Sequence, residues 1–488
     1  MESQARRFVL LLALIAAAAG HVLAQSANAT LSGFVRDSQG AVVPNAKVTA
    51  EQIATHQIYN TVSSGDGVYN ILNLPVGEYR ITTEAPGFKT AVVPATTLQT
   101  AQVASLNVTL SIGAVTDQVV VTDTVPLINT EDTSIGQVVE NRSIESLALN
   151  GRQFWQLVAL VPGATYTPGG QGTRTGGSSI RSSAVNVQIN GTGFIYNGWM
   201  LDGVDVTEYE QGGTNVQPNV DALAEFKVLG ANMPAAYGHT PNMVTATIKS
   251  GTDKFHGELF EFIRNDIADA HNYFARTSKN ILKRNQFGGT LGGPIIHEKA
   301  FFFTDFEETR QSQGIVFNDI VPTDAERTGD YSSATVKPLN PLTGARFPGD
   351  KVPISRQAAF FLPYLPTRAQ ANFTAPQSLI IKKGDGKIDA ALSTKDHLMG
   401  RYSITDNIES DPNQFQALGQ QTLASRAQNI ALTEAHTFGA KWLNQASVLS
   451  RKFVNKGGRV SEGWSLLWRS MRRGGSCGCN VGRSGRFW

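Results

Sequence analysis

The stretch that decides the fold is Arg284-Asn-Gln-Phe-Gly-Gly-Thr-Leu-Gly-Gly-Pro294. In an extended chain Phe287 and Leu291 fall on one side of this segment. Gln286 and Thr290 fall on the opposite side. Alternation over about ten residues is typical of a membrane β-strand, which has lipid on one face and a polar lumen on the other. A half-buried sheet of a soluble protein has the same period, so periodicity leaves both interpretations open.

Similar alternating segments recur in the second half of the chain. They include Ala300–Phe306, Leu398–Thr405 and Ile430–Phe438. Residues 311–386 are loop-like and rich in proline, as expected of a long excursion away from a sheet. The sequence therefore predicts a strand-rich region over residues 254–456.

The N-terminus has the pattern of an export signal. Arg6-Arg7 precede an apolar run from Phe8 to Ala19, and a small-residue cleavage site ends at Ala24. The run is shorter than the ~20 apolar residues that a transmembrane helix needs. We expect residues 1–24 to be a signal peptide. No later run is long and apolar enough for such a helix, so any membrane-spanning part has to consist of strands.

The composition excludes several classes of protein. Lys plus Arg number 42 and Asp plus Glu number 40, so the chain lacks the basic surplus of a nucleic-acid-binding protein. The two cysteines, Cys477 and Cys479, form neither a disulfide framework nor a CxxC zinc pair. We expect no nucleic-acid partner, no cofactor and no metal site.

Residues 27–112 contain short strands separated by turns about every ten residues, which favours a small β-sandwich. Several motifs in this region resemble the carboxypeptidase regulatory-like domain, a transthyretin-like sandwich without catalytic activity. They are Gly33-Phe-Val-Arg-Asp37, Asp66-Gly-Val-Tyr69, Leu74-Pro-Val-Gly-Glu-Tyr79 and Pro86-Gly-Phe88.

Candidate catalytic patterns are weak throughout. None of the eight histidines is followed by Glu three residues later, which argues against a zinc peptidase. Gly474-Gly-Ser-Cys-Gly478 matches the GxSxG pattern in form, but it follows no strand and has no companion His or acid nearby. Asp202 and Asp205 look like turn residues and lack the spacing of a calcium loop. We predict no catalytic residue and no enzyme activity.

A series of motifs resembles, in the same order, large Oar-like TonB-dependent outer-membrane receptors. The resemblance implies a mainly β chain with an N-terminal sandwich, an α+β plug domain over residues 126–253 and the first part of a transmembrane β-barrel over 254–456. The motifs are Asn150–Phe154, Leu201–Asp205, Ala224–Val228, Lys249–Gly257, Phe260–Asn265, Arg284–Pro294 and Phe301–Phe303.

The linker over residues 113–125 contains a short extended segment. An exposed segment of this kind can add a strand to a partner's sheet, and it can equally be the first strand of the next domain. In the family that the chain resembles, this is the place of the Ton box, which implies the TonB energy-coupling complex as a partner. The segment consists of Asp117, Gln118, Val119, Val120, Val121 and Thr122.

The length of the strand region conflicts with a complete barrel. A barrel that encloses a plug needs about 22 strands, or about 440 residues, whereas about 200 residues lie between Phe255 and Asn455. Residues 457–488 are rich in Gly, Arg and Trp and show no strand pattern. We therefore expect the chain to be the N-terminal part of a longer, C-terminally truncated receptor that does not transport by itself.

The sequence leaves two functions open. The first is a TonB-dependent receptor in the outer-membrane lipid with an unknown extracellular ligand. The Gly/Ser/Thr-rich residues 167–183 favour an oligosaccharide or another large polar nutrient. The alternative is an exported, non-transporting carbohydrate-binding or adhesin-like β protein, which would be recovered without detergent.

Overall fold

The computed structural model describes most of the chain between residues 28 and 472. Within this part no helix is long and apolar enough to cross a membrane. The predicted signal peptide and the Gly474–Gly478 motif lie outside it. The described residues are 28–114, 118–120, 135–147, 149–166, 187–209, 213–231, 233, 240–270, 281–318, 320–367, 372–413, 420–439, 442–455 and 459–472.

The N-terminal part is a β-sandwich. One sheet has the order β4-β1-β7, with β8 also paired to β1, and the other has the order β3-β2-β5-β6-β9. Gly33 is required because a Cβ atom there would lie 1.9 Å from the carbonyl oxygen of Leu106. The strands are β1 (Ala29–Asp37), β2 (Lys47–Gln52), β3 (Ile58–Val62), β4 (Val68–Leu74), β5 (Gly77–Glu84), β6 (Thr90–Leu98), β7 (Val103–Ser105), β8 (Val108–Leu110) and β9 (Gln118–Val120).

The middle part has a mixed five-stranded sheet with the order β10-β17-β18-β13-β14. Phe154 fixes its core by packing edge-on against Trp155, Trp199 and Phe226. The elements are β10 (Ile135–Glu140), α2 (Asn141–Ser146), η1 (Phe154–Leu160), β11 (Ala164–Tyr166), β12 (Val187–Ile189), η2 (Phe194–Tyr196), β13 (Asn197–Leu201), β14 (Val204–Asp205), β15 (Thr207–Glu208), β16 (Gly213–Thr214), η3 (Val220–Ala222), β17 (Leu223–Ala231) and β18 (Asn242–Ile248).

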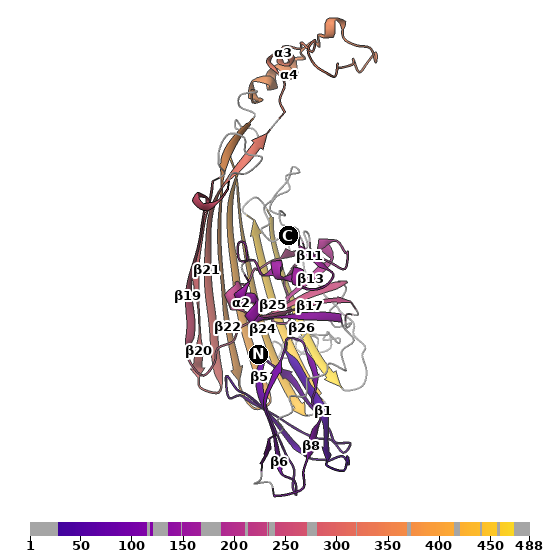
Figure 1. Ribbon diagram of the computed structural model, residues 1–488, viewed down its shortest axis with the longest axis vertical. Coiled ribbons are helices and arrows are strands. Elements are labelled where there is room, and N and C mark those ends of the chain that lie inside the picture. Colours follow the sequence, from indigo (N-terminus) through magenta and orange to yellow (C-terminus); the bar gives the residue numbers. More distant parts are fainter. Residues whose placement is uncertain are drawn as a thin grey trace, which may run out of the picture.

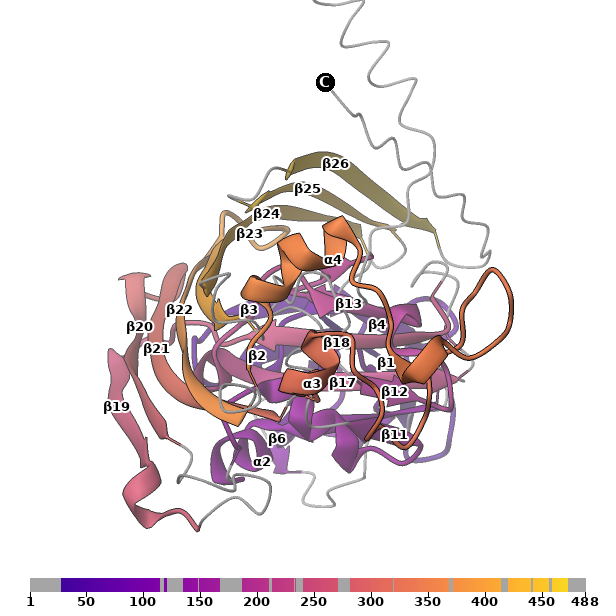
Figure 2. The same ribbon diagram turned by 90° about the horizontal axis from the view of Figure 1, so that it is seen from above.

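The third part is an eight-stranded antiparallel sheet in which each strand pairs with the next along the chain. Seen from above, it curves around one side of the middle part and does not close (Figure 2). Its elements are β19 (His256–Asn265), η5 (Asp266–Ala268), β20 (Leu282–Ile296), β21 (Ala300–Asn318), α3 (Asp324–Arg327), η6 (Pro348–Asp350), α4 (Arg356–Phe361), η7 (Leu362–Tyr364), β22 (Asn372–Ala391), β23 (Asp396–Pro412), β24 (Gln420–Gly439), β25 (Trp442–Asn455) and β26 (Arg459–Arg472).

Two expectations about this sheet need correction. The strand pattern does not end at residue 456, because β26 pairs with β25 over Arg459–Arg472. The excursion is shorter than residues 311–386, because β21 runs to Asn318 and β22 begins at Asn372. In the supposed excursion, Gln311-Ser-Gln313 is polar at every position, so the two-residue period is hard to recognise there.

The burial of side chains on the two faces of the sheet decides between a soluble sheet and a membrane barrel, which the periodicity of the sequence had left open. Arg401 is 2% exposed and packs towards the middle part, whereas Ile430 and Leu432 are 49% and 46% exposed on the opposite face. A soluble sheet would bury the leucine and expose the arginine. The reverse arrangement is the one that a membrane barrel has, with lipid outside and polar groups inside.

Charged side chains mark the two ends of the apolar outer face. At one end Asp396 contacts His436, and ten residues further along β23 Asp406 makes a bidentate pair with Arg426 at 2.5 and 2.6 Å. Ten strand residues span about 33 Å, or about 25 Å along the membrane normal at the usual tilt. This matches the height of the apolar band of an outer-membrane barrel.

The ends of the sheet differ in their connections. Turns of three or four residues join β20 to β21 and β22 to β23, and the N-terminal sandwich lies at this end (Figure 1). The opposite end carries the long connection between β21 and β22, which includes α3 and α4. Outer-membrane barrels have short turns on the periplasmic side, so the end of the sheet that carries the sandwich corresponds to the periplasmic end of such a barrel.

Candidate functional site: the contact between plug and sheet

The middle part of the chain, here called the plug, is connected to the sheet by the buried carboxylate of Asp202. Its Oδ1 atom accepts a hydrogen bond from Lys387 Nζ at 3.0 Å, and its Oδ2 atom lies 3.1 Å from Arg401 Nε. The backbone N–H of Ile248 also donates to Oδ1, at 3.1 Å. Lys387 and Arg401 come from β22 and β23, so one plug carboxylate holds two adjacent strands.

Local geometry explains why Asp occupies this position. Asp202 and Gly203 form the two-residue turn between β13 and β14, with φ angles of 49° and 75°. Asp-Gly is a favoured pair for such type I′ hairpins because both residues need positive φ. The prediction of a turn residue is confirmed for Asp202 and wrong for Asp205, which pairs with Met200 as the last residue of β14. The buried ion pairs of Asp202 were not foreseen.

A second ionic cluster begins at Arg152, in the Asn150–Phe154 motif. Its guanidinium pairs with Asp221, lies 3.6 Å from Glu307 on β21 and stacks 4.1 Å from the ring centre of Phe262 on β19. Glu307 is fully buried and also pairs with Lys383 at 3.2 Å. Charges buried this deeply must be paired, so these contacts fix the plug against the wall.

The sandwich contacts the plug through the loop between β6 and β7. The backbone N–H of Thr100 donates to the Glu225 carboxylate, and the Thr100 hydroxyl lies 2.9 Å from the hydroxyl of Thr247. Lys227 Nζ donates to the carbonyl of Ala101 at 3.2 Å. Burial raises the pKa of Glu225 above its ordinary value.

A cavity of about 110 Å³ lies where the three parts meet. Tyr59 of the sandwich stacks on His397 at the periplasmic end of the sheet, with ring centres 4.7 Å apart. Ser250 donates a 2.6 Å hydrogen bond to Asp389 on another side of the cavity. The sandwich therefore covers the periplasmic side of the contact between plug and sheet.

The Ton-box-like segment is described in part. Gln118, Val119 and Val120 form β9, which pairs in parallel with Thr90–Val92 of β6. Asp117, Val121 and Thr122 lie outside the described residues. β9 is an edge strand of its sheet, and the side chains of Val119 and Val120 are 38% and 52% exposed. One backbone edge of β9 thus has no strand partner within the described part of the chain.

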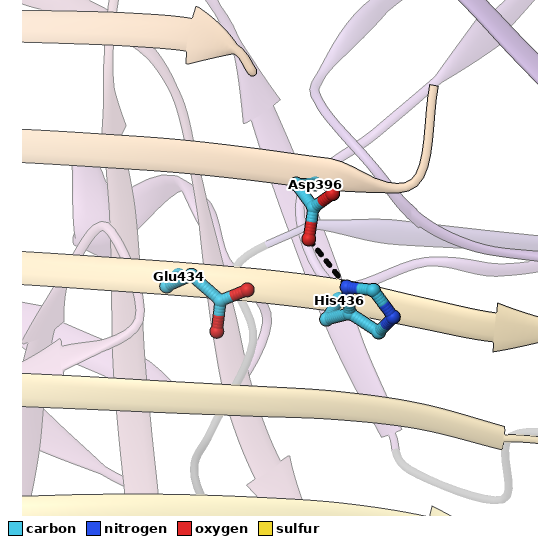
Figure 3. Close-up of side chains that lie close together, drawn as sticks. All are labelled: Asp396, Glu434 and His436. Atoms are coloured by element: carbon cyan, nitrogen blue, oxygen red, sulfur yellow. Dashed lines mark hydrogen bonds and ion pairs between the residues drawn. The ribbon is translucent and has the colours of Figure 1, made fainter. Parts of the chain in front are cut away.

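One group of side chains in the described ranges has the donor set of a metal site. Asp396, Glu434 and His436 lie together on two neighbouring strands of the sheet (Figure 3). They are separate from the ionic clusters described above. Sequence reasoning missed them because Asp396 lies forty residues from His436, and only the strand register brings the two together.

The sequence comparisons identify a class of outer-membrane β-barrel proteins. The model of the outer membrane beta barrel domain matches residues 247–463, and that of the carboxypeptidase regulatory-like domain matches residues 30–111. These matches agree with the mainly β fold and the unclosed barrel, so the expected fold class is confirmed. The chain is an outer-membrane protein.

A particular relative is the TonB-dependent transporter Oar of Myxococcus xanthus, 27% identical over 299 residues. The match covers 57% of this chain and 26% of that protein, so the chain spans about a quarter of this curated relative. The chain is thus a partial homologue of an Oar-like transporter, which confirms the resemblance. The relative is a transporter.

Two solved structures overlap with the chain in part. The outer membrane transporter YddB of Escherichia coli has a TM-score of 0.42 and 11% identity, over 68% of this chain and 42% of that one. A ferric enterobactin receptor of Pseudomonas aeruginosa has a TM-score of 0.40 and 15% identity, over 68% and 44% of the two chains.

Proposed function

We propose that the chain acts as a TonB-dependent outer-membrane receptor, with the plug held by its sheet until energy is supplied. The observation that carries this proposal is the buried pairing of Asp202 with Lys387 and Arg401. Such a contact makes the plug a separate element seated in a polar wall. Moving the plug out of the wall requires work to break these ion pairs, and diffusion of a ligand alone does not supply that work.

In this proposal the segment Asp117–Thr122 binds the TonB energy-coupling complex. An extended segment pairs through main-chain hydrogen bonds, and β9 has an open edge that suits this mode. The extracellular ligand is proposed to be an oligosaccharide or another large polar nutrient. The support for this ligand class is the composition of residues 167–183, which lie outside the described ranges.

The test is binding of the periplasmic C-terminal domain of TonB to the full chain in detergent micelles. We expect saturable binding that falls at least tenfold when Val119 and Val120 are both replaced by Asp. The matched control replaces Val42 and Ile58, which are similarly exposed on the same sandwich, by Asp. Binding that does not respond to the Val119 and Val120 changes would refute the proposed role of the segment.

The unclosed sheet favours a second candidate, an exported carbohydrate-binding or adhesin-like protein that does not transport. The two candidates differ in how the chain behaves with TonB and with polysaccharides. Retention on an immobilised polysaccharide without any binding to the TonB domain would favour the second candidate. Binding to the TonB domain through β9 would favour the first.

A further inference from the structure

Asp396, Glu434 and His436 share the outer face of the sheet at its periplasmic end. The register pairs Asp396 of β23 with His436 of β24, and Leu398 with Glu434. Glu434 and His436 are two residues apart on one strand, so their side chains lie on the same face. Figure 3 shows the three side chains on these adjacent strands, with the His436 ring directed to Asp396.

The donor atoms already converge. One carboxylate oxygen from each acid and one ring nitrogen of His436 lie within 4.8 Å of one another. Ligand atoms at the usual zinc distance of about 2.0–2.2 Å are separated by about 3.3 Å in a tetrahedron, so small side-chain rotations complete the site. Three protein ligands leave the fourth position open for water.

The surrounding charges favour a cation. The charged groups that act on Glu434 are Asp396 and His436, and Glu434 forms no hydrogen bond or ion pair within the described residues. Two carboxylates therefore lie beside a single imidazole at one end of the apolar band. A divalent ion would neutralise this pair of acids where membrane lipid replaces water.

The site is also held in place before any ion binds. The backbone N–H of Leu392 donates to the carbonyl of Asp396 at 2.9 Å, and the Ser393 hydroxyl donates to its carboxylate. These bonds fix the tight turn that precedes β23. His436 packs against Phe438, with ring centres 4.3 Å apart, which restricts the imidazole.

We propose that Asp396, Glu434 and His436 bind a divalent transition metal ion such as Zn²⁺ at the periplasmic boundary of the membrane. An imidazole ligand favours zinc or a similar ion over Ca²⁺ and Mg²⁺, which prefer oxygen. The ion clamps the beginning of β23 to the end of β24. This assignment departs from the expectation that the chain has no metal site, and it is independent of the proposed transport function.

The test uses the purified full chain in detergent micelles, stripped with EDTA. Cys477 and Cys479 are first changed to Ser, because thiolates would bind zinc on their own. Titration with Zn²⁺ by calorimetry is expected to show one ion per chain, with Ca²⁺ failing to compete at equal concentration. Replacement with Co²⁺ should give the visible absorption of a site with nitrogen and oxygen ligands.

His436→Ala is expected to weaken Zn²⁺ binding at least tenfold, and Glu434→Gln to weaken it by a similar factor. The matched control is His56→Ala. His56 also contacts a carboxylate, Glu51, at 3.0 Å, but among the described residues this pair has no third ligand in reach. The control should bind Zn²⁺ like the parent chain.

Circular dichroism of each variant checks that the strand content is kept. If His436→Ala loses strand content, Glu434→Gln and Asp396→Asn decide the question, because both substitutions nearly preserve side-chain size. The proposal fails if the parent chain does not bind one Zn²⁺ saturably. It also fails if folded variants at these three positions bind as tightly as the His56 control.

Discussion

The carboxylate of Asp202 lies in the interior because two cations and a peptide N–H surround it. Its neighbour Asp205 comes from the same short motif but is partly exposed, and it accepts a hydrogen bond from the hydroxyl of Tyr209 at 2.8 Å. Two acids three residues apart thus have different roles: Asp202 is paired inside the protein, and Asp205 is bonded near the surface. Asp202 and Asp205 differ in burial and in the residues that they contact, and the motif predicts neither the burial nor the contacts.

Asp202→Asn is expected to loosen the plug from the sheet. The change leaves Lys387 and Arg401 buried without their counter-charge, which costs about 3–5 kcal/mol. Hydrogen exchange of Asn242–Ile248, which pairs with the strand before Asp202, should accelerate. Asp205→Asn is the control and should change exchange little, because this side chain keeps contact with solvent. Equal effects of the two variants would contradict the assignment.

At the residue scale the sequence predicted the motifs but not their partners. The Asn150–Phe154 and Leu201–Asp205 motifs were recognised only as a resemblance, and both turned out to contact the sheet through Arg152 and Asp202. The partners Glu307, Lys383, Lys387 and Arg401 are ordinary polar residues of alternating strands. Their roles depend on which strand lies next to the plug, and the sequence contains no local signal for that.

At the scale of elements, β6 connects the Ton-box-like strand to the plug. Its first residues, Thr90–Val92, pair with β9, and its last residue, Leu98, leads into the loop that contacts Glu225. A force applied to β9 would therefore reach the plug along β6 as well as through the covalent chain that leads on to β10. The sandwich is a mechanical connection in this arrangement as well as a cover.

Locking β9 to β6 tests which edge a partner uses. Val92 and Val120 are register neighbours, so Val92→Cys with Val120→Cys, made in a Cys477→Ser and Cys479→Ser background, should form a disulfide. We expect the oxidised chain to bind the TonB domain within about twofold of the reduced chain, because the outer edge of β9 stays open. Binding that disappears on oxidation and returns on reduction would show that the partner displaces β6.

Acidity should tighten the contact between the sandwich and the plug. Burial raises the pKa of Glu225, so the docked state favours the protonated carboxyl. This stabilisation is fully present below the ordinary pKa of 4.5 and is lost as the pH rises through the raised value. Hydrogen exchange of Gln99–Gln102, corrected for intrinsic rates, should be slower at pH 5 than at pH 7.5. Glu225→Gln should abolish that difference while keeping the hydrogen bond from Thr100.

At the scale of the whole molecule, the sheet has two open edges. β19 pairs with β20 alone and β26 with β25 alone among the described strands. Unpaired backbone groups in hydrocarbon cost several kcal/mol each, so an open sheet is a poor membrane insert. We expect fast hydrogen exchange along β19 and strong protection along β22. The chain should also lack the heat-dependent shift in gel mobility that closed barrels show. Equal protection of β19 and β22 would mean that the edge is covered.

The order of the three parts was well predicted from the sequence, because each has its own pattern of turns or alternation. The sandwich strands and the alternating faces of β24 agree with the expectations. The contacts by which the three parts pack against one another could not be predicted from the sequence. The register that brings Asp396 beside His436 and the docking of Thr100 on Glu225 both depend on contacts between residues far apart in the chain.

The length of the β21–β22 hairpin has a consequence outside the membrane. The register places Glu308 beside Lys382 and Lys382 beside Asp406, so one charged row crosses three strands at the upper boundary. Ten further residue pairs continue above that row, which carries the hairpin about 33 Å along its strands away from the bilayer. The helical cap α3–α4 stands on this stalk (Figure 1). An antibody or a phage approaching the cell would therefore meet the cap well before it met the lipid.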